Sequence, residues 1–296
     1  MEKRSVFKST WLPIVFALPQ LTLILLFFYW PVAAVMNWAF TLEPPFGGAA
    51  EFVGLDNFRE VFHDPFYWNS VLVSIIFAVC GALSAIFIGL VLALAVDRQL
   101  PGSGFFRFLY ILPFAVAGPA GGIAFRFILS PERGLAAILN SIEPDLWNPA
   151  KYGSHALAFV IMIFIWKWAG YTFIFLLAGL QSVPRALIEA AAMDGSGPIR
   201  RAIDIQVPLL APTLFFLLVT MMTEGFVGSD TFGMVHATTA GGPNRATEVM
   251  VYRIVDEAFH GLNYSGASAQ SIVLIGLIMV FTFIQFRFIE RRVHYK

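Results

Sequence analysis

The sequence predicts an all-α integral membrane protein, on the basis of its composition and its long uncharged runs. Of its 296 residues, 58% are hydrophobic and only 13% are charged, and the mean hydropathy is +0.75. Soluble domains are about 45–50% apolar and about 25% charged, so lipid must surround most of this chain. A spanning helix needs about 20 apolar residues, whereas barrel strands alternate over about ten. We therefore expect one transmembrane domain over residues 1–296.

Six runs are long and apolar enough to cross a membrane. In chain order, the expected spans are 12–40, 70–96, 106–129, 156–181, 207–228 and 266–288. The first run contains three prolines, is longer than the core of a signal peptide and lacks a small-residue cleavage site, so we expect it to remain as an anchor. The second and sixth have uninterrupted uncharged cores.

The third, fourth and fifth spans carry features that a plain lipid-facing helix does not need. Residues 113–122 of the third contain three glycines and two prolines, the fourth carries Lys167 near its middle, and the fifth carries Glu224 near its end. Irregular backbone at membrane depth is tolerated where it is buried in protein or lines a wet cavity. Close helix packing through small residues is the alternative explanation for the third span.

The distribution of lysine and arginine predicts that both termini are cytoplasmic. Twelve of these residues fall on the side of the N-terminus and five on the other side, and cytoplasmic loops carry the excess. The larger set is Lys3, Arg4, Lys8, Arg98, Arg107, Arg185, Arg200, Arg201, Arg287, Arg291, Arg292 and Lys296. The smaller set is Arg59, Arg133, Lys151, Arg245 and Arg253.

Several classes of function are excluded by what the chain lacks. Its net charge of zero argues against a nucleic-acid partner, which needs a basic surface. The sequence contains no G-x-x-x-x-G-K-[ST] loop for ATP phosphates and no nucleophile–base arrangement. Its five histidines are scattered singly and its one cysteine lies in an apolar run, so we expect no metal site and no catalytic residue. We expect a chain that is not itself an enzyme and holds no cofactor.

The loop at 184–205, between the fourth and fifth spans, has a pattern of its own. Pro184 suits the start of a helix, since its missing N–H would be unpaired there. A compact alanine-rich helix is then expected to end at Gly195, and a second short helix carries Arg200 and Arg201. The pattern predicts two short amphipathic helices joined by a sharp corner. An ordinary hairpin on the membrane surface is the alternative interpretation.

This loop resembles the EAA loop of ABC importer permeases. Glu189-Ala190-Ala191 is followed by three residues, Gly195, nine residues, Ile205, one residue and Val207-Pro208. The family pattern usually ends Leu-Pro, so Val207 is a departure. The resemblance implies the type I ABC importer permease fold with six transmembrane helices, in which this cytoplasmic coupling loop docks on an ATPase subunit. The coupling residues that it implies are Glu189, Ala190, Ala191, Asp194, Gly195, Arg200 and Arg201.

Other residues extend the resemblance to the carbohydrate-importer branch of the family. They are Trp11 to Pro13, Phe52 to Phe58, Leu112-Pro113, Gly241 to Pro243 and Ala267 to Ser271. Residues 7–13, 187–201 and 285–287 are most similar to permeases for sn-glycerol-3-phosphate, and maltose and trehalose permeases share many of them. The resemblance implies import of sn-glycerol-3-phosphate or a related glycerophosphodiester across a bacterial inner membrane by alternating access. A maltose- or trehalose-like sugar is the alternative.

The resemblance also implies a heteromeric complex embedded in membrane lipid. The partners would be a second homologous permease, two cytoplasmic ATPases that bind ATP and Mg, and an extracytoplasmic solute-binding protein. One rival interpretation is an ion-coupled secondary transporter, which predicts inverted repeats or paired intramembrane carboxylates. A membrane enzyme would need clustered catalytic side chains. The sequence presents none of these features.

The candidate solute pathway rests on five residues, Gly118, Pro119, Lys167, Trp168 and Gly242. A buried ammonium is costly unless it faces a polar interior, so Lys167 either lines the pathway or pairs with a carboxylate on a partner subunit. The turn-rich stretch with Gly242 either lines the outer cavity, contacts a docking protein or covers the bundle. For Arg126, Glu224 and Asp230, positions near the ends of spans favour simple anchoring or snorkelling.

Overall fold

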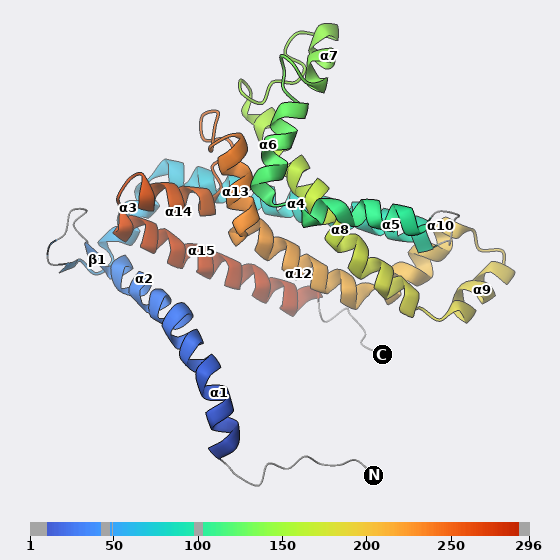
Figure 1. Ribbon diagram of the computed structural model, residues 1–296, viewed down its shortest axis with the longest axis horizontal. Helices are drawn as coiled ribbons and strands as arrows, with labels where there is room; N and C mark the ends of the chain where they lie inside the picture. Colours follow the sequence, from blue (N-terminus) through green and yellow to red (C-terminus); the bar gives the residue numbers. More distant parts are fainter. Residues whose placement is uncertain (1–10, 43–47, 49, 98–102, 290–296) are drawn as a thin grey trace. The chain divides into compact units, whose positions relative to one another are not determined.

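The computed structural model describes residues 11–42, 48, 50–97 and 103–289, most of them in helices (Figure 1). By its internal contacts the chain divides into two compact units. One is Met1–His63 with Glu257–Val273, and the other is Asp64–Asp256 with Leu274–Lys296. The boundary falls within two helices, α14 (Met250–Phe259) and α15 (Tyr264–Ile284). The expectation of a single transmembrane domain stays a prediction.

The first unit begins with a long apolar helical run, which is followed by two short strands and a short helix. Its elements are α1 (Trp11–Ile24), the π-helical turn η1 (Leu25–Tyr29), α2 (Trp30–Phe40), β1 (Thr41–Leu42), β2 (Glu51–Phe52) and α3 (Asp56–His63). The two strands are antiparallel, with Thr41 opposite Phe52. The Asn57 side chain donates 3.0 Å hydrogen bonds to the carbonyls of Ala39 and Thr41. It thereby satisfies backbone acceptors that the end of α2 leaves open.

The second unit contains most of the helices. They are α4 (Pro65–Asp97), α5 (Ser103–Ile111), η2 (Leu112–Ala115), α6 (Gly118–Ile128), α7 (Leu135–Ile142), α8 (Gly153–Ser182), α9 (Arg185–Met193), α10 (Pro198–Arg201), η3 (Ala202–Gln206), α11 (Val207–Leu209), α12 (Ala211–Val227), α13 (Ser229–Thr238), part of α14 and α15, and η4 (Gln285–Ile289). α9 and α10 follow the C-terminal end of α8, whereas α7 precedes its N-terminal end (Figure 1).

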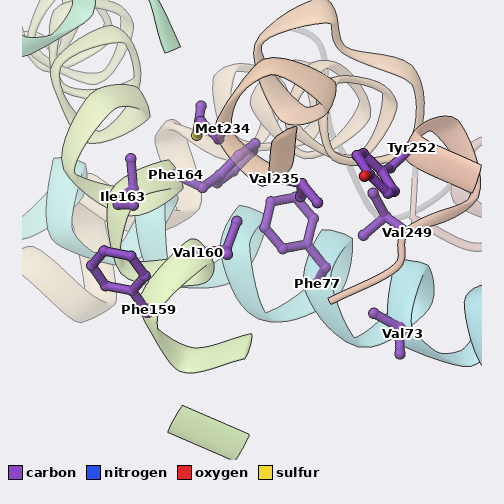
Figure 2. Close-up of a cluster of buried hydrophobic side chains, with 10 residues drawn as sticks. All are labelled: Val73, Phe77, Phe159, Val160, Ile163, Phe164, Met234, Val235, Val249 and Tyr252. Atoms are coloured by element: carbon purple, nitrogen blue, oxygen red, sulfur yellow. The ribbon is translucent and has the colours of Figure 1, made fainter. Parts of the chain in front are cut away.

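The core of the second unit lies where α4 and α8 pack side by side. Figure 2 shows its larger cluster, in which Phe77 of α4 and Phe164 of α8 meet edge to face at 5.2 Å. A Cβ atom built on Gly81 would lie 2.8 Å from the Phe164 ring, and one on Gly225 of α12 would lie 2.8 Å from Ala78. Because lipid tails are as apolar as these side chains, such close packing rather than exclusion from water holds the helices together.

The described residues include four helices long and apolar enough to span a membrane, and up to six spans if each of two bent pairs is one. The first pair is bent by 104° between Ala115 and Gly118, which confirms the broken backbone predicted for the third span. The second pair joins the second short helix of the loop to the fifth span, and it is bent by 72° at Leu210, an angle that the sequence did not predict. Pro208 and Pro212 flank this bend and have no N–H for the helical ladder.

Some sequence predictions concern residues outside those described. They include the charges of Lys3, Arg4, Lys8, Arg98, Arg291, Arg292 and Lys296, together with residues 7–10 of the family resemblance. The orientation argued from charge therefore stays a prediction.

Candidate functional site

The 184–205 loop forms the two short helices that the sequence predicts, α9 and α10. The backbone of Pro184 is not helical, and α9 begins at the next residue. Neither α9 nor α10 has a buried residue. The corner between them keeps the two helices apart from the packed core of the unit.

The corner is a Schellman motif centred on Gly195. The N–H of Ser196 donates to the carbonyl of Ala191 at 2.9 Å, and the N–H of Gly195 donates to that of Ala192 at 3.1 Å. Gly195 has φ +77°, a left-handed conformation in which a side chain is strained. The glycine of the motif is thus required by the backbone that ends α9.

The outer surface of the loop combines charge with exposed apolar side chains. Arg200 pairs with Asp204 at 3.2 Å along one helical face. Met193, Ile199 and Ile203 are 89%, 73% and 61% exposed. An apolar surface with a polar rim, presented beyond the ends of the long helices, is typical of a protein–protein contact.

Behind the loop lies a cavity of about 840 Å³, between the loop and the ends of α4, α5 and α8. Glu189 and Arg201 line it, together with Arg107, Arg185 and Asp97. The other coupling residues named from the sequence, Ala190, Ala191, Asp194, Gly195 and Arg200, are not among its lining residues. Ile199 and Ile203 line the cavity as well, although both are largely exposed, so the cavity opens to the surface at the loop.

Lys167 of α8 lies at the break in the third span. Its side chain is only 6% exposed, and its ammonium donates hydrogen bonds to the carbonyls of Phe114, at 3.2 Å, and Val116. It also forms an ion pair with Asp230 at 3.2 Å. The sequence hypothesis placed a carboxylate for Lys167 on a partner subunit, whereas the structure finds one in the same chain.

Asp230 is the residue at this site that sequence reasoning missed. It lies in the first turn of α13, and its second oxygen accepts the N–H of Gly118 at 2.8 Å, at the start of α6. The snorkelling expected for Asp230 is therefore wrong, because a broken helix offers this carboxylate polar partners at depth. The sequence showed a deep lysine and a glycine-proline break, each of which needs polar partners, but nothing in it connected either feature to Asp230.

Lys167 and Asp230 together satisfy the two ends of the break. At the end of η2 and just beyond it, the carbonyls of Phe114 and Val116 accept hydrogen bonds from the Lys167 ammonium. At the start of α6, the N–H of Gly118 donates to the Asp230 carboxylate. Carbonyl ends of helices favour cations and N–H ends favour anions. The pair therefore compensates both half-helices at once, in addition to its own attraction.

Aromatic side chains surround the ammonium. The rings of Phe114 and Trp168 each lie 5.6 Å from Lys167 Nζ, in cation–π range. Tyr171 packs against both rings. The indole nitrogen of Trp168 is buried and has no hydrogen-bond partner among the described residues, so this wall holds one free donor.

α6 and α13 run parallel along a seam of glycines that starts at the ion pair. A Cβ on Gly118 would lie 2.7 Å from an Asp230 oxygen, and one on Gly122 would lie 2.9 Å from the Thr238 methyl. From the other side, a Cβ on Gly233 would meet the Pro119 ring at 2.5 Å. The third span is therefore broken, as expected, and the glycines beyond the break serve close helix packing, which was the alternative explanation.

Gly242 lies in a separate cavity of about 330 Å³. Arg126, Phe159, Thr238 and Pro243 also line it, and Lys167 and Trp168 do not. The peptide bond between Gly242 and Pro243 is cis. The five candidate pathway residues thus fall into two places, the break and this outer cavity.

The loop between α6 and α8 contributes to the wall of the outer cavity and is held by its own polar contacts. The Asn140 amide both accepts from the Trp147 N–H at 2.8 Å and donates to its carbonyl at 3.0 Å. Hydrogen bonds from Lys151, and then from Asn148, lower the pKa of Asp145. These contacts fix the loop without contributing chemistry to either site.

A polar network fixes the start of α14 against α4. The Glu248 carboxylate accepts from the Ser70 hydroxyl at 3.0 Å and lies 3.5 Å from the Arg253 guanidinium, which also pairs with Asp64. The sequence indicated a helix here but not these partners, because the contacts join residues almost 190 positions apart. In the described part of the chain, no group of three or more histidine, cysteine, aspartate or glutamate side chains is placed to hold a metal ion.

Comparison with known proteins places this architecture in a described family. The family model for "binding-protein-dependent transport system inner membrane component" matches residues 85–295. The chain is 40% identical over 293 residues to the sn-glycerol-3-phosphate transport system permease protein UgpA of Pectobacterium atrosepticum. It is 42% identical to the proteins of the same name from Rhizobium meliloti and from Brucella abortus. In each case the match covers 99% of both chains.

Solved structures share the fold. A chain of a bacterial ABC transporter that imports the acidic polysaccharide alginate superposes with a TM-score of 0.80 at 22% identity, covering 95% of this chain and 96% of that one. A second alginate transporter structure, in complex with its alginate-pentasaccharide-bound periplasmic protein, gives a TM-score of 0.80 at 21% identity, covering 95% and 94%.

Proposed function

We propose a function from one premise: the chain belongs to the family of binding-protein-dependent transport system inner membrane components. It is a permease subunit of an ATP-driven ABC importer that carries sn-glycerol-3-phosphate, or a related glycerophosphodiester, across the inner membrane. The observation that carries the choice of solute is the 40–42% identity to glycerol-phosphate permeases over 99% of both chains. The alginate transporters are too distant to argue for a sugar instead, because at 21–22% identity they share only the fold.

In this proposal the chain does no chemistry of its own. Two cytoplasmic ATPase subunits would bind and hydrolyse ATP with Mg, and the 184–205 loop would receive their movement. The loop suits this role because its helices have no buried residue and expose apolar side chains next to Glu189 and Arg200. Gly195 would keep the corner sharp, and the bend at Leu210 would pass the movement into α12.

The other proposed partners follow from the family. A second, homologous permease would complete the pathway, and an extracytoplasmic solute-binding protein would deliver the solute, as a periplasmic protein is bound in one alginate transporter structure. No residue of α1 is buried within this chain, so lipid or the second permease must cover it. With both termini in the cytoplasm, the loop faces the ATPases and the outer cavity faces the binding protein.

We place the solute pathway along the broken third span. Gly118 and Pro119 begin the half-helix beyond the break, and Lys167 and Trp168 border it. The aromatic wall of Phe114, Trp168 and Tyr171 suits a polyol, whose C–H faces can pack against the rings. Asp230 already compensates the charge of Lys167. In this proposal Lys167 therefore acts chiefly by holding the aromatic wall in place. Gly242 would lie further out, in the outer cavity.

The test is transport by the reconstituted complex. The two permeases and the ATPase would be placed in liposomes with the binding protein outside, and uptake of labelled sn-glycerol-3-phosphate would be compared with uptake of maltose and trehalose. ATP-dependent uptake of the phosphorylated solute alone supports the proposal. Uptake of a sugar without glycerol-3-phosphate would select the alternative, and uptake driven by an ion gradient without ATP would refute both.

A further inference from the structure

The cavity behind the 184–205 loop is lined by both apolar and charged side chains. α4 contributes Phe87, Leu90, Val91 and Leu94 to its lining, and three arginines from other elements line it as well. These arginines are Arg107 from the first turns of α5, Arg185 from the start of α9 and Arg201 from the end of α10. The apolar side chains belong to a helix long enough to span the membrane, so the arginines lie at the membrane boundary.

Among the described residues that line the cavity, positive charge exceeds negative charge. Three arginines stand against two carboxylates, Asp97 and Glu189. Furthermore, the Nε of Arg107 is buried and has no hydrogen-bond partner among the described residues. A buried guanidinium donor without an acceptor is unusual, and none of the described residues supplies one, so the site has room for a further acceptor.

We propose that this cavity binds an anionic phospholipid from the cytoplasmic leaflet. Its phosphate would accept hydrogen bonds from Arg107, Arg185 and Arg201, and its acyl chains would lie along Phe87 and Val91. The proposal rests on the membrane orientation proposed above, which places this end of α4 at the cytoplasmic side. Basic pockets between transmembrane helices on that side suit phospholipid head groups. A guanidinium pairs with phosphate in two parallel hydrogen bonds, so arginine fits this ligand better than a point charge would.

A lipid in this position would affect the coupling between ATP hydrolysis and transport. Arg107 belongs to α5, which leads into the broken third span, whereas Arg185 and Arg201 belong to the coupling helices. A phosphate held by all three ties the loop to the membrane helices at the point where ATPase movement enters. Coupling then depends on the anionic lipid content of the membrane, and its loss loosens the loop without removing any protein contact.

The experiment uses the whole complex, with matched arginine variants. The complex is purified and exposed to vesicles of phosphatidylcholine with increasing phosphatidylglycerol content. The retained lipid is measured by native mass spectrometry. The variants are Arg107→Gln, Arg201→Gln and the pair of both. Arg200→Gln is the control, because Arg200 adjoins Arg201 in sequence but pairs with Asp204 and does not line the cavity.

We expect retention of phosphatidylglycerol to fall about fivefold for each arginine lost, and not to change in Arg200→Gln. Solute-stimulated ATP hydrolysis should rise with phosphatidylglycerol in the wild type and lose that dependence in the double variant. Equal retention in all variants would overturn the proposal. So would displacement of the lipid by inorganic phosphate at millimolar concentration, since a soluble anion would then be the ligand, or loss of ATPase subunits from the variants irrespective of lipid. A complex that fails to import glycerol-3-phosphate, yet retains lipid as expected, would refute only the proposed solute.

Discussion

Replacing Asp230 by asparagine tests whether one ion pair holds the break in the third span. Asparagine keeps an oxygen for the Gly118 N–H but removes the charge beside Lys167. Breaking a buried ion pair from one side costs about 3–5 kcal/mol. Lys167 retains two carbonyl acceptors and the Asp230 side chain is 26% exposed, so solvent screening reduces the expected loss to about 2 kcal/mol.

The assay is thermal unfolding of the detergent-purified complex, followed by size-exclusion chromatography after heating. For a chain of this size a loss of about 2 kcal/mol corresponds to a Tm lower by roughly 4–8 °C. The double variant Lys167→Met with Asp230→Asn should be more stable than the sum of its single variants predicts, by about 1–2 kcal/mol. A Tm of Asp230→Asn within a degree of the wild type, or strictly additive effects, would refute the reasoning.

Exchanging the two charges separates a simple ion pair from a pair that also compensates helix ends. In Lys167→Asp with Asp230→Lys the attraction between the two side chains is restored. The new aspartate, however, faces the carbonyls of Phe114 and Val116, and the new lysine faces the N–H of Gly118. We therefore expect the exchanged variant to be no more stable than Asp230→Asn. Recovery of wild-type stability would show that the helix ends contribute nothing.

Three further predictions concern the coupling loop and the topology. Glu189→Lys should lower both solute-stimulated ATP hydrolysis and uptake by about tenfold or more, while membrane insertion is unchanged. Glu143→Lys in the outer loop is the control, and normal rates in Glu189→Lys would contradict the docking role of the loop. Gly195→Ala should strain the left-handed corner by about 1 kcal/mol and so raise the number of ATP molecules hydrolysed per solute imported. An unchanged ratio of ATP to solute would contradict the role given to this corner. A reporter fused after Lys296 should be cytoplasmic and one inserted near Ala49 should be external, and the opposite labelling would overturn the orientation.

Most helices were predictable because each depends on a local pattern. The long apolar runs, the break near Gly118 and the corner at Gly195 all follow from the residues that form them. The bend at Leu210 was not predicted, although the prolines at 208 and 212 were visible, because proline alone does not say whether neighbouring helices will support a kink or a straight span.

The partners of buried charges were the least predictable part of the site. Lys167 and Asp230 are 63 positions apart, and Asp64 and Arg253 are 189 apart. No pattern within a single helix connects such residues, because only the packing of helices brings them together. The deep lysine was therefore recognised as a site that needs a partner, while the identity of that partner required the structure.

The glycine seam between α6 and α13 has a mechanical consequence. Gly118 and Gly122 on one helix and Gly233 on the other interlock within van der Waals contact, so neither helix can slide or rotate against the other without a collision. The two helices form a stiff rod, and compliance is concentrated at its base, where the backbone is already non-helical at Val116, Ala117 and Gly228. We therefore expect α6 and α13 to tilt together, and because Thr238 lines the outer cavity, such a tilt would move the wall of that cavity.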